Sequence, residues 1–153
     1  MKKDEKIALG LIAALGIFPL QALSATSEVV FQRADTLTRN TVVKLLGPEL
    51  KKAESFSDVP SVIMTSSMRV SEAPFLFVMF QNHYHCGNVN CEVWGFERTS
   101  TGWHKVFQGN GEKWTIKAHA VGEHHDIAEL RHDSAFQQSR FIFRWDGKIY
   151  RRR

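Results

Sequence analysis

Cysteine and proline are scarce in this chain, and several motifs that mark enzymes are missing. Its 153 residues include two cysteines and four prolines. The chain has no Gly-x-Ser-x-Gly elbow, no glycine-rich phosphate loop and no lone cysteine, so it gives no support to a serine hydrolase, a nucleotide-binding domain or a thiol enzyme. It also lacks a long Pro/Ser-rich linker and any fixed-period repeat. A second domain, a propeller and a solenoid are therefore not indicated.

The chain also lacks a large excess of charge of one sign. Residues 26–153 hold 17 Lys and Arg against 14 Asp and Glu. So small an excess does not indicate a nucleic-acid partner. Cations gather near the C-terminus as a candidate basic patch made of Arg140, Arg144, Lys148 and Arg151. Two interpretations stay open for this patch: a solvated strand face with a frayed tail, or a site for an acidic protein or an anionic envelope surface.

The first 25 residues have the three-part pattern of a secretory signal. Lys2, Lys3 and Lys6 form a positive start, residues 7–20 are an apolar run, and small residues precede residue 26. The run is short for a membrane span and is interrupted by glycine and proline, although an uncleaved anchor stays open as the alternative. We expect residues 26–153 to form one domain that is periplasmic or secreted, with no membrane span after cleavage.

A helix is predicted over residues 27–46, from apolar positions at helical spacing: Val30, Ala34, Leu37, Thr41 and Leu45. Ser27 would cap its N-terminus. Gly47-Pro48 would stop it, because proline disfavours helical geometry at the residue before it. A short turn is expected over residues 49–53.

From residue 59 onward the hydrophobic period changes to two, which predicts strands. The almost unbroken apolar run of residues 75–80 is typical of a central strand buried on both faces. Gly109-Asn110-Gly111 would separate two further strands. We therefore expect an α+β fold: an antiparallel β-meander of about six to eight short strands with an N-terminal helix packed on one side.

The clearest local signal is a C-terminal hairpin. Asp146-Gly147 is typical of a two-residue turn, which would place Phe143 opposite Tyr150. Alternation along the first strand puts one set of side chains on one face and a second set on the other: Phe141, Phe143 and Trp145 against Arg140, Ile142 and Arg144.

Cys86 and Cys91 are separated by four residues and are expected to form a disulfide at the tip of a hairpin, as the predicted export implies. In that register His85 faces Glu92, and His83 faces Trp94. The enclosed candidate binding loop is Gly87, Asn88, Val89 and Asn90. Its role stays open between a structural staple and a recognition loop. A redox-active pair is a weaker alternative, because the reactive pattern has two intervening residues.

All seven histidines fall between residues 83 and 132. His83 and His85 would point the same way on a strand, and Glu92 or His104 could supply a third metal ligand. No zinc signature accompanies them, so we expect no cofactor. The alternatives are a genuine metal site and a group of surface histidines that makes the protein sensitive to pH.

Residues 75–85, the Cys86–Cys91 loop and the return strand of residues 92–96 follow an export signal and a helix. In this order they resemble the periplasmic inhibitor of vertebrate-type lysozyme. The resemblance implies a curved antiparallel sheet with a helix on one side. It also implies that the disulfide loop enters the lysozyme cleft and blocks it.

These patterns favour a non-enzymatic exported binding domain. It would contact a protein or cell-envelope partner through the disulfide-closed loop, and it could inhibit a cell-wall hydrolase. Two alternatives remain: a metal-binding periplasmic protein that uses His83 and His85, and a structural envelope protein.

Overall fold

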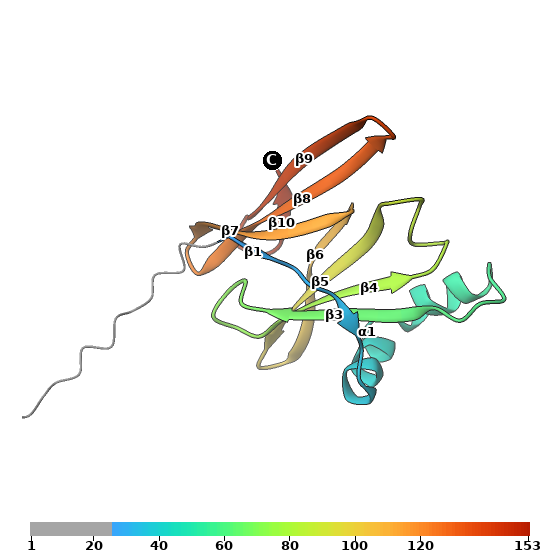
Figure 1. The fold of residues 1–153 in the computed structure, drawn as a ribbon. Coiled ribbons are helices and arrows are strands. Elements are labelled where there is room, and N and C mark those ends of the chain that lie inside the picture. The colour runs from blue at the N-terminus through green and yellow to red at the C-terminus, as the bar shows by residue number, and fades with distance from the viewer. Residues whose placement is uncertain (1–25) are drawn as a thin grey trace, which may run out of the picture.

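The computed structural model describes residues 26–153, which contain two antiparallel sheets and one long helix (Figure 1). Sheet A consists, in spatial order, of β1 (Ser27–Glu28), β7 (Lys113–Val121), β8 (His124–Ser134), β9 (Gln137–Trp145) and β10 (Tyr150–Arg152). Sheet B consists of β2 (Gln32–Arg33), β3 (Val62–Met68), β4 (Phe75–Gln81), β5 (Cys91–Thr99) and β6 (Gly102–Gly111). The helix α1 spans Thr36–Glu54. The predicted export signal lies outside the described residues.

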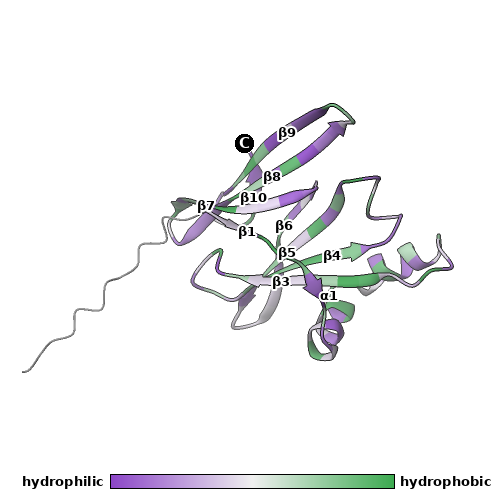
Figure 2. Ribbon diagram, in the orientation of Figure 1, coloured by the Kyte–Doolittle hydropathy of each residue, from purple (hydrophilic) through white to green (hydrophobic). Residues whose placement is uncertain are grey.

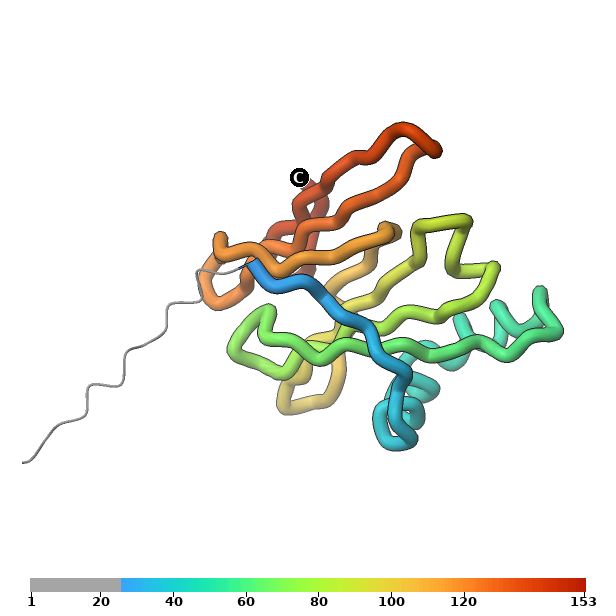
Figure 3. Tube along the Cα trace, in the orientation of Figure 1, coloured from blue at the N-terminus to red at the C-terminus, as the bar shows by residue number. Residues whose placement is uncertain are grey.

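The chain builds each sheet as a meander and passes between the sheets twice. It first runs from β1, paired with β7, to β2, paired with β3, so the N-terminal segment joins one edge of each sheet (Figure 3). It passes a second time at Glu112, from β6 of sheet B to β7 of sheet A. The predicted antiparallel fold with one helix is confirmed in outline. The described residues form ten strands in two sheets, however, and two of these strands precede the helix. None of their helices is long and apolar enough to cross a membrane.

Strand β4 is buried on both faces, as predicted, and stands out as hydrophobic in Figure 2. Phe75 and Phe77 point into a core between the two sheets, where they meet residues of sheet A: Trp114, Ile116, Ile127, Phe143 and Tyr150. The alternate residues of β4 point into a second core under the helix, formed by Leu76, Val78 and Phe80 with Val42, Leu46 and Leu50. The molecule is therefore layered as helix, sheet B and sheet A.

The helix begins at Thr36, which corrects the predicted start at Ser27. Asp35 is the N-cap, because its Oδ1 accepts a hydrogen bond from the Thr38 N–H at 2.8 Å. That bond lowers the pKa of Asp35. Residues 27–33 instead supply β1 and β2. Their β-branched Val29 and Val30 suit extended backbone better than a helix.

The helix also continues past the predicted stop at Gly47-Pro48. Leu46 leaves helical geometry, with φ −125° and ψ 21°, so two helical segments meet at a kink there. Pro48 stands near the start of the second segment, where its missing N–H is tolerated. The buried helix positions are Val42, Leu46, Leu50 and Ala53, whereas Val30 and Leu37 of the predicted apolar face are exposed.

The C-terminal hairpin has the predicted faces but a longer turn. Tyr150 lies opposite Trp145 and not opposite Phe143, so residues 146–149 form the turn. The Asp146 Oδ1 accepts hydrogen bonds from the Ile149 and Lys148 N–H groups, each at 2.9 Å. The Ile149 bond, the adjacent Arg151 side chain and the Lys148 bond together lower the pKa of Asp146 to about 2.

Gly109 and Gly111 do not form the predicted turn, since both lie within β6, where this strand of sheet B packs against residues of sheet A. A Cβ atom at Gly109 would lie 2.4 Å from the Trp114 ring and 2.7 Å from the Glu129 Oε2. One at Gly111 would lie 2.6 Å from the Glu129 Cγ. The two glycines therefore allow the two sheets to approach closely at this point.

Glu129 is a fully buried carboxylate at this contact between the sheets. Its Oε1 pairs with Arg131 at 2.7 Å, and its Oε2 accepts a hydrogen bond from the Asn110 N–H at 3.2 Å. Burial raises the pKa of Glu129, because Arg131 and the Asn110 N–H offset only part of the lost hydration.

The close approach predicts a destabilising Gly109→Ala substitution. Forcing a methyl group against Trp114 should lower the free energy of unfolding by about 1–3 kcal/mol. Gly47→Ala is the matched control: a Cβ there meets nothing within 4 Å. That control should be neutral or stabilising by up to about 1 kcal/mol, because alanine favours helix. Urea unfolding monitored by tryptophan fluorescence measures both; equal losses would contradict the account of Gly109.

The raised pKa of Glu129 gives stability a definite dependence on pH. The folded state binds this proton more tightly than the unfolded chain, whose ordinary pKa is 4.5. The contribution of Glu129 to the free energy of unfolding should therefore fall as pH rises through that value toward the folded pKa. Glu129→Gln removes this contribution, so its stability relative to wild type should improve across that window. Urea titrations at several pH values test this, and a constant difference would contradict it.

Candidate binding surface at the disulfide loop

The predicted disulfide joins Cys86 and Cys91. The two cysteines face each other as an isolated antiparallel bridge, and the Glu92 N–H donates to the His85 carbonyl at 2.8 Å. The predicted pairing of His85 with Glu92 is therefore confirmed. Inside the ring, residues 87–90 close a tight turn through the Gly87 N–H, which donates to the carbonyl of residue 90 at 2.8 Å.

A turn of residues 82–86 separates this bridge from β4, and it corrects the rest of the predicted register. The Cys86 N–H donates to the Asn82 carbonyl at 2.9 Å, as in a single turn of helix. Because this turn takes up extra residues, Val78 lies opposite Trp94. His83 does not face Trp94 and is exposed within the turn.

His85 is buried under the loop among aromatic rings. The centroid of its imidazole lies 4.8 Å from Tyr84, 5.0 Å from Trp94 and 5.3 Å from Phe80. Its Nδ1 is 2.9 Å from the Glu92 Oε2. The imidazole thus fills the space between the turn and β5, so this histidine supports the loop from below.

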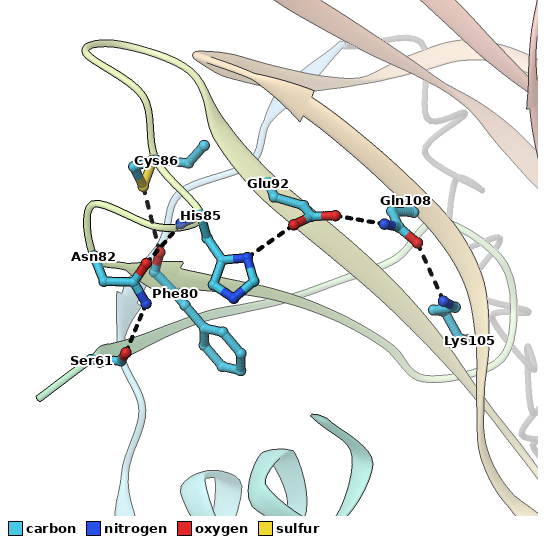
Figure 4. Close-up of polar contacts among 9 residues, drawn as sticks. Ser61, Phe80, Asn82, His85, Cys86, Glu92, Lys105 and Gln108 are labelled. Carbon is cyan, nitrogen blue, oxygen red and sulfur yellow. Dashed lines mark hydrogen bonds and ion pairs between the residues drawn. A yellow bond between two sulfur atoms is a disulfide. The ribbon is translucent and has the colours of Figure 1, made fainter. Parts of the chain in front are cut away.

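Polar contacts fix both sides of the loop base (Figure 4). On one side the Asn82 side chain donates to the Ser61 hydroxyl at 2.7 Å and accepts from the His85 N–H at 2.8 Å. On the other side the contacts continue across β5 and β6: Glu92 accepts from Gln108, and Gln108 accepts from Lys105. The base of the loop is therefore joined to the residue before β3 on one side and to β6 on the other.

Asn90 ties the loop to the other sheet. Its Nδ2 donates to the His132 carbonyl at 2.7 Å, and its Oδ1 accepts from the His132 N–H at 3.0 Å. The amide side chain therefore pairs with β8 much as another peptide group would. The Nδ2 and the Oδ1 of Asn90 are thus both hydrogen-bonded. Asn88, by contrast, makes no side-chain hydrogen bond within the described residues.

Three loops adjoin one another at one end of the molecule, and we call their surface the loop end. They are the α1–β3 loop (residues 55–61), the disulfide loop (residues 82–90) and the tip of the β8–β9 hairpin (residues 133–136), seen along the right side of Figure 1. A hollow of about 270 Å³ lies between the first two loops. Another of about 320 Å³ lies between the disulfide loop and the hairpin tip.

The loop end is rich in exposed apolar side chains. The described residues contain nine large hydrophobic residues that are exposed, and five of them lie here: Phe56, Val59, Tyr84, Val89 and Phe136. Phe56 stacks on Tyr84 with ring centroids 5.2 Å apart, and the Lys52 ammonium lies 5.7 Å from the Tyr84 ring. Phe136 is fully exposed. This arrangement offers apolar contact area on a framework held by hydrogen bonds.

The four candidate metal ligands do not converge. His85 is buried against Glu92, His83 is exposed, and His104 bonds the Thr101 hydroxyl at 2.8 Å. Within residues 26–153 no group of three or more His, Cys, Asp or Glu side chains is placed to hold a metal ion. Four of the histidines pair with carboxylates instead: His85 with Glu92, His119 with Asp126, His124 with Glu97 and His132 with Glu112.

The candidate basic patch lies away from the loop end, on sheet A and its last turn. Arg144 pairs with Asp126 at 2.9 Å, which raises the arginine pKa further, and Arg151 pairs with Asp146. Lys148 is exposed in the turn of residues 146–149, and Arg140 is exposed on β9. Two of the four predicted cations are therefore already neutralised by acids of the same chain.

The sequence-based prediction did not include Phe56, Val59, Tyr84 or Phe136 in the site. An exposed apolar residue in a loop has the same sequence pattern as one that folds inward. Apart from Tyr84, these residues also lie far from the cysteines in the sequence, and only the topology brings their loops together.

No family model, curated protein or solved structure matches the chain. The loop end offers a disulfide-closed loop, bonded to both sheets and bordered by exposed aromatic and aliphatic side chains.

The Asn90 contact predicts that the loop is fixed to β8. Asn90→Ala should weaken this attachment by about 1–2 kcal/mol, because it removes two hydrogen bonds. The His132 amide hydrogen should then exchange with solvent at least about tenfold faster. Asn88→Ala, an exposed change in the same loop, is the matched control and should leave that exchange unchanged. Equal His132 exchange rates in the two variants, followed by NMR, would contradict the attachment.

Proposed function

We propose that the protein is an exported binding protein that holds a protein partner of the cell envelope at its loop end, and that the partner to test first is a cell-wall hydrolase. The observation that supports this is the gathering of exposed apolar side chains on three adjoining loops. Contiguous exposed apolar surface in a folded domain marks an interaction site more often than a structural need.

The apolar residues supply the kind of contact that dominates protein interfaces. Burial of one large apolar side chain contributes about 2 kcal/mol, and aromatic anchors carry much of the affinity where they become fully buried. Phe56 of the α1–β3 loop stacks on Tyr84 at one side of the disulfide loop, and the hairpin tip with Phe136 adjoins its other side. A partner that covers the loop would therefore meet an aromatic group at each side of it.

The disulfide loop is held in place before it binds. Closing so small a ring stabilises the fold by only about 2 kcal/mol. The greater benefit comes on binding, because a loop that is already ordered loses less conformational entropy. The ring contains no charged side chain, so its contacts would come from Val89, the Asn88 amide and backbone groups.

Enzyme inhibition tests the proposal. Purified protein, with its disulfide verified by mass spectrometry, is added in micromolar excess to vertebrate-type lysozyme and to a panel of other muramidases and amidases. At least one of these enzymes should be slowed. Val89→Ser, Tyr84→Ser and Phe136→Ser should each weaken that inhibition at least about tenfold, the size expected for an interface anchor.

Leu37→Ser is the matched control, because Leu37 is 81% exposed on the first turns of α1, away from the loop end. It should leave the inhibition unchanged. If no hydrolase in the panel is slowed, the inhibitor role is wrong. If one is slowed and the three loop-end variants inhibit as well as wild type does, the binding site lies elsewhere.

A further inference from the structure

Sheet A has a second face, turned away from the inter-sheet core, and this face is basic. The strand register places Lys113, Leu130 and Arg140 in one row across β7, β8 and β9. The next row is Thr115, Ala128 and Ile142. The helix packs on sheet B, so it does not cover this face. We call the surface around Lys113, Lys117 and Arg140 the basic face.

The three cations of the basic face surround a shallow hollow of about 300 Å³. Apolar side chains form its floor and hydroxyl groups its edge: Ala128 and Leu130 with Thr26 and Thr115. Two acidic residues also line the hollow: Glu28, and the fully buried Glu129, whose carboxylate is paired with Arg131.

The cations of the basic face have no acidic partner in the described part of the chain. The arginines farther along sheet A are paired, Arg144 with Asp126 and Arg151 with Asp146. By contrast, Lys113, Lys117 and Arg140 make no ion pair with a described residue. The three cations surround one hollow, so their like charges repel one another. A negatively charged surface laid on this face would relieve that repulsion.

We propose that the basic face binds the surface of an anionic lipid bilayer. The first reason is its shape: Lys113 and Arg140 stand two strands apart, about 10 Å, over an apolar floor. Such spacing suits an array of lipid headgroups better than one small anion. Cations beside the half-buried Leu130 and Ile142 match the interfacial layer of a membrane, where charge and hydrocarbon lie close together.

The second reason is the position of Thr26. It lines the hollow, and in the sequence it follows the apolar run of residues 7–20 after five further residues. Six fully extended steps span about 20 Å. If the chain is exported as proposed, with that run held in a bilayer, the basic face would lie within this reach of the lipid surface. The same cations would keep an affinity for that surface after cleavage.

Vesicle sedimentation tests the proposal with protein purified from an exporting host, its N-terminus established by mass spectrometry. Wild type should bind vesicles of phosphatidylglycerol and phosphatidylcholine, and bind vesicles of phosphatidylcholine alone at least tenfold less. Lys113→Gln with Arg140→Gln should lower the partition coefficient about 25-fold, about fivefold for each charge removed. Added sodium chloride should weaken the binding of wild type in the same direction.

Lys44→Gln with Lys51→Gln is the control, because it removes the same charge from exposed positions on α1. It should leave lipid binding near the wild-type value. Urea unfolding confirms that both double variants are folded. Equal binding to charged and neutral vesicles, or equal losses in the two variants, would overturn the proposal. So would competition by millimolar inorganic phosphate, which assigns the hollow to a free anion, or tighter binding to polyglutamate than to vesicles, which assigns it to an acidic protein.

Discussion

The burial of β4 on both faces is the constraint on which the rest of the structure depends. Its alternating side chains fill two cores at once, one with sheet A and one with the helix. A strand that is apolar on both sides is stable only when a layer covers each of them. Sheet B therefore becomes the middle layer. The short apolar side of the helix and the inner face of sheet A are each held in position by contacts with the same strand.

The loop end follows from this layering, since each layer contributes one loop. The α1–β3 loop comes from the helix layer, the disulfide loop from the middle sheet and the hairpin tip from sheet A. Their common position is fixed by contacts between layers: Asn82 with Ser61 on one side and Asn90 with His132 on the other. The basic face belongs to sheet A, on the side turned away from sheet B. The two proposed binding surfaces are thus formed by different parts of the fold.

The sequence was most informative where a pattern had one physical solution. The run of residues 75–80 specified a strand buried on both faces, and the cysteine spacing specified the pairing of His85 with Glu92. Prediction failed where a local pattern had two solutions. Asp146-Gly147 suits a two-residue turn, but the Asp146 carboxylate bonds two backbone N–H groups and stabilises a longer one. Gly109 and Gly111 had the pattern of a turn, although they serve the close approach of β6 to Glu129. The extra turn before Cys86 depends on the Asn82 contacts, which no periodicity reveals.

We infer that the disulfide loop is an ordered surface fixed to both sheets before any partner binds. Backbone ¹⁵N relaxation of residues 87–90 in the oxidised protein tests it most directly. Order parameters close to those of the neighbouring strands, about 0.85, are expected. Contacts between the Asn90 side-chain amide protons and His132 should appear in the same NMR sample. Order parameters below about 0.6 in the loop would contradict the claim, because they would describe a flexible ring joined to the protein only at its cysteines.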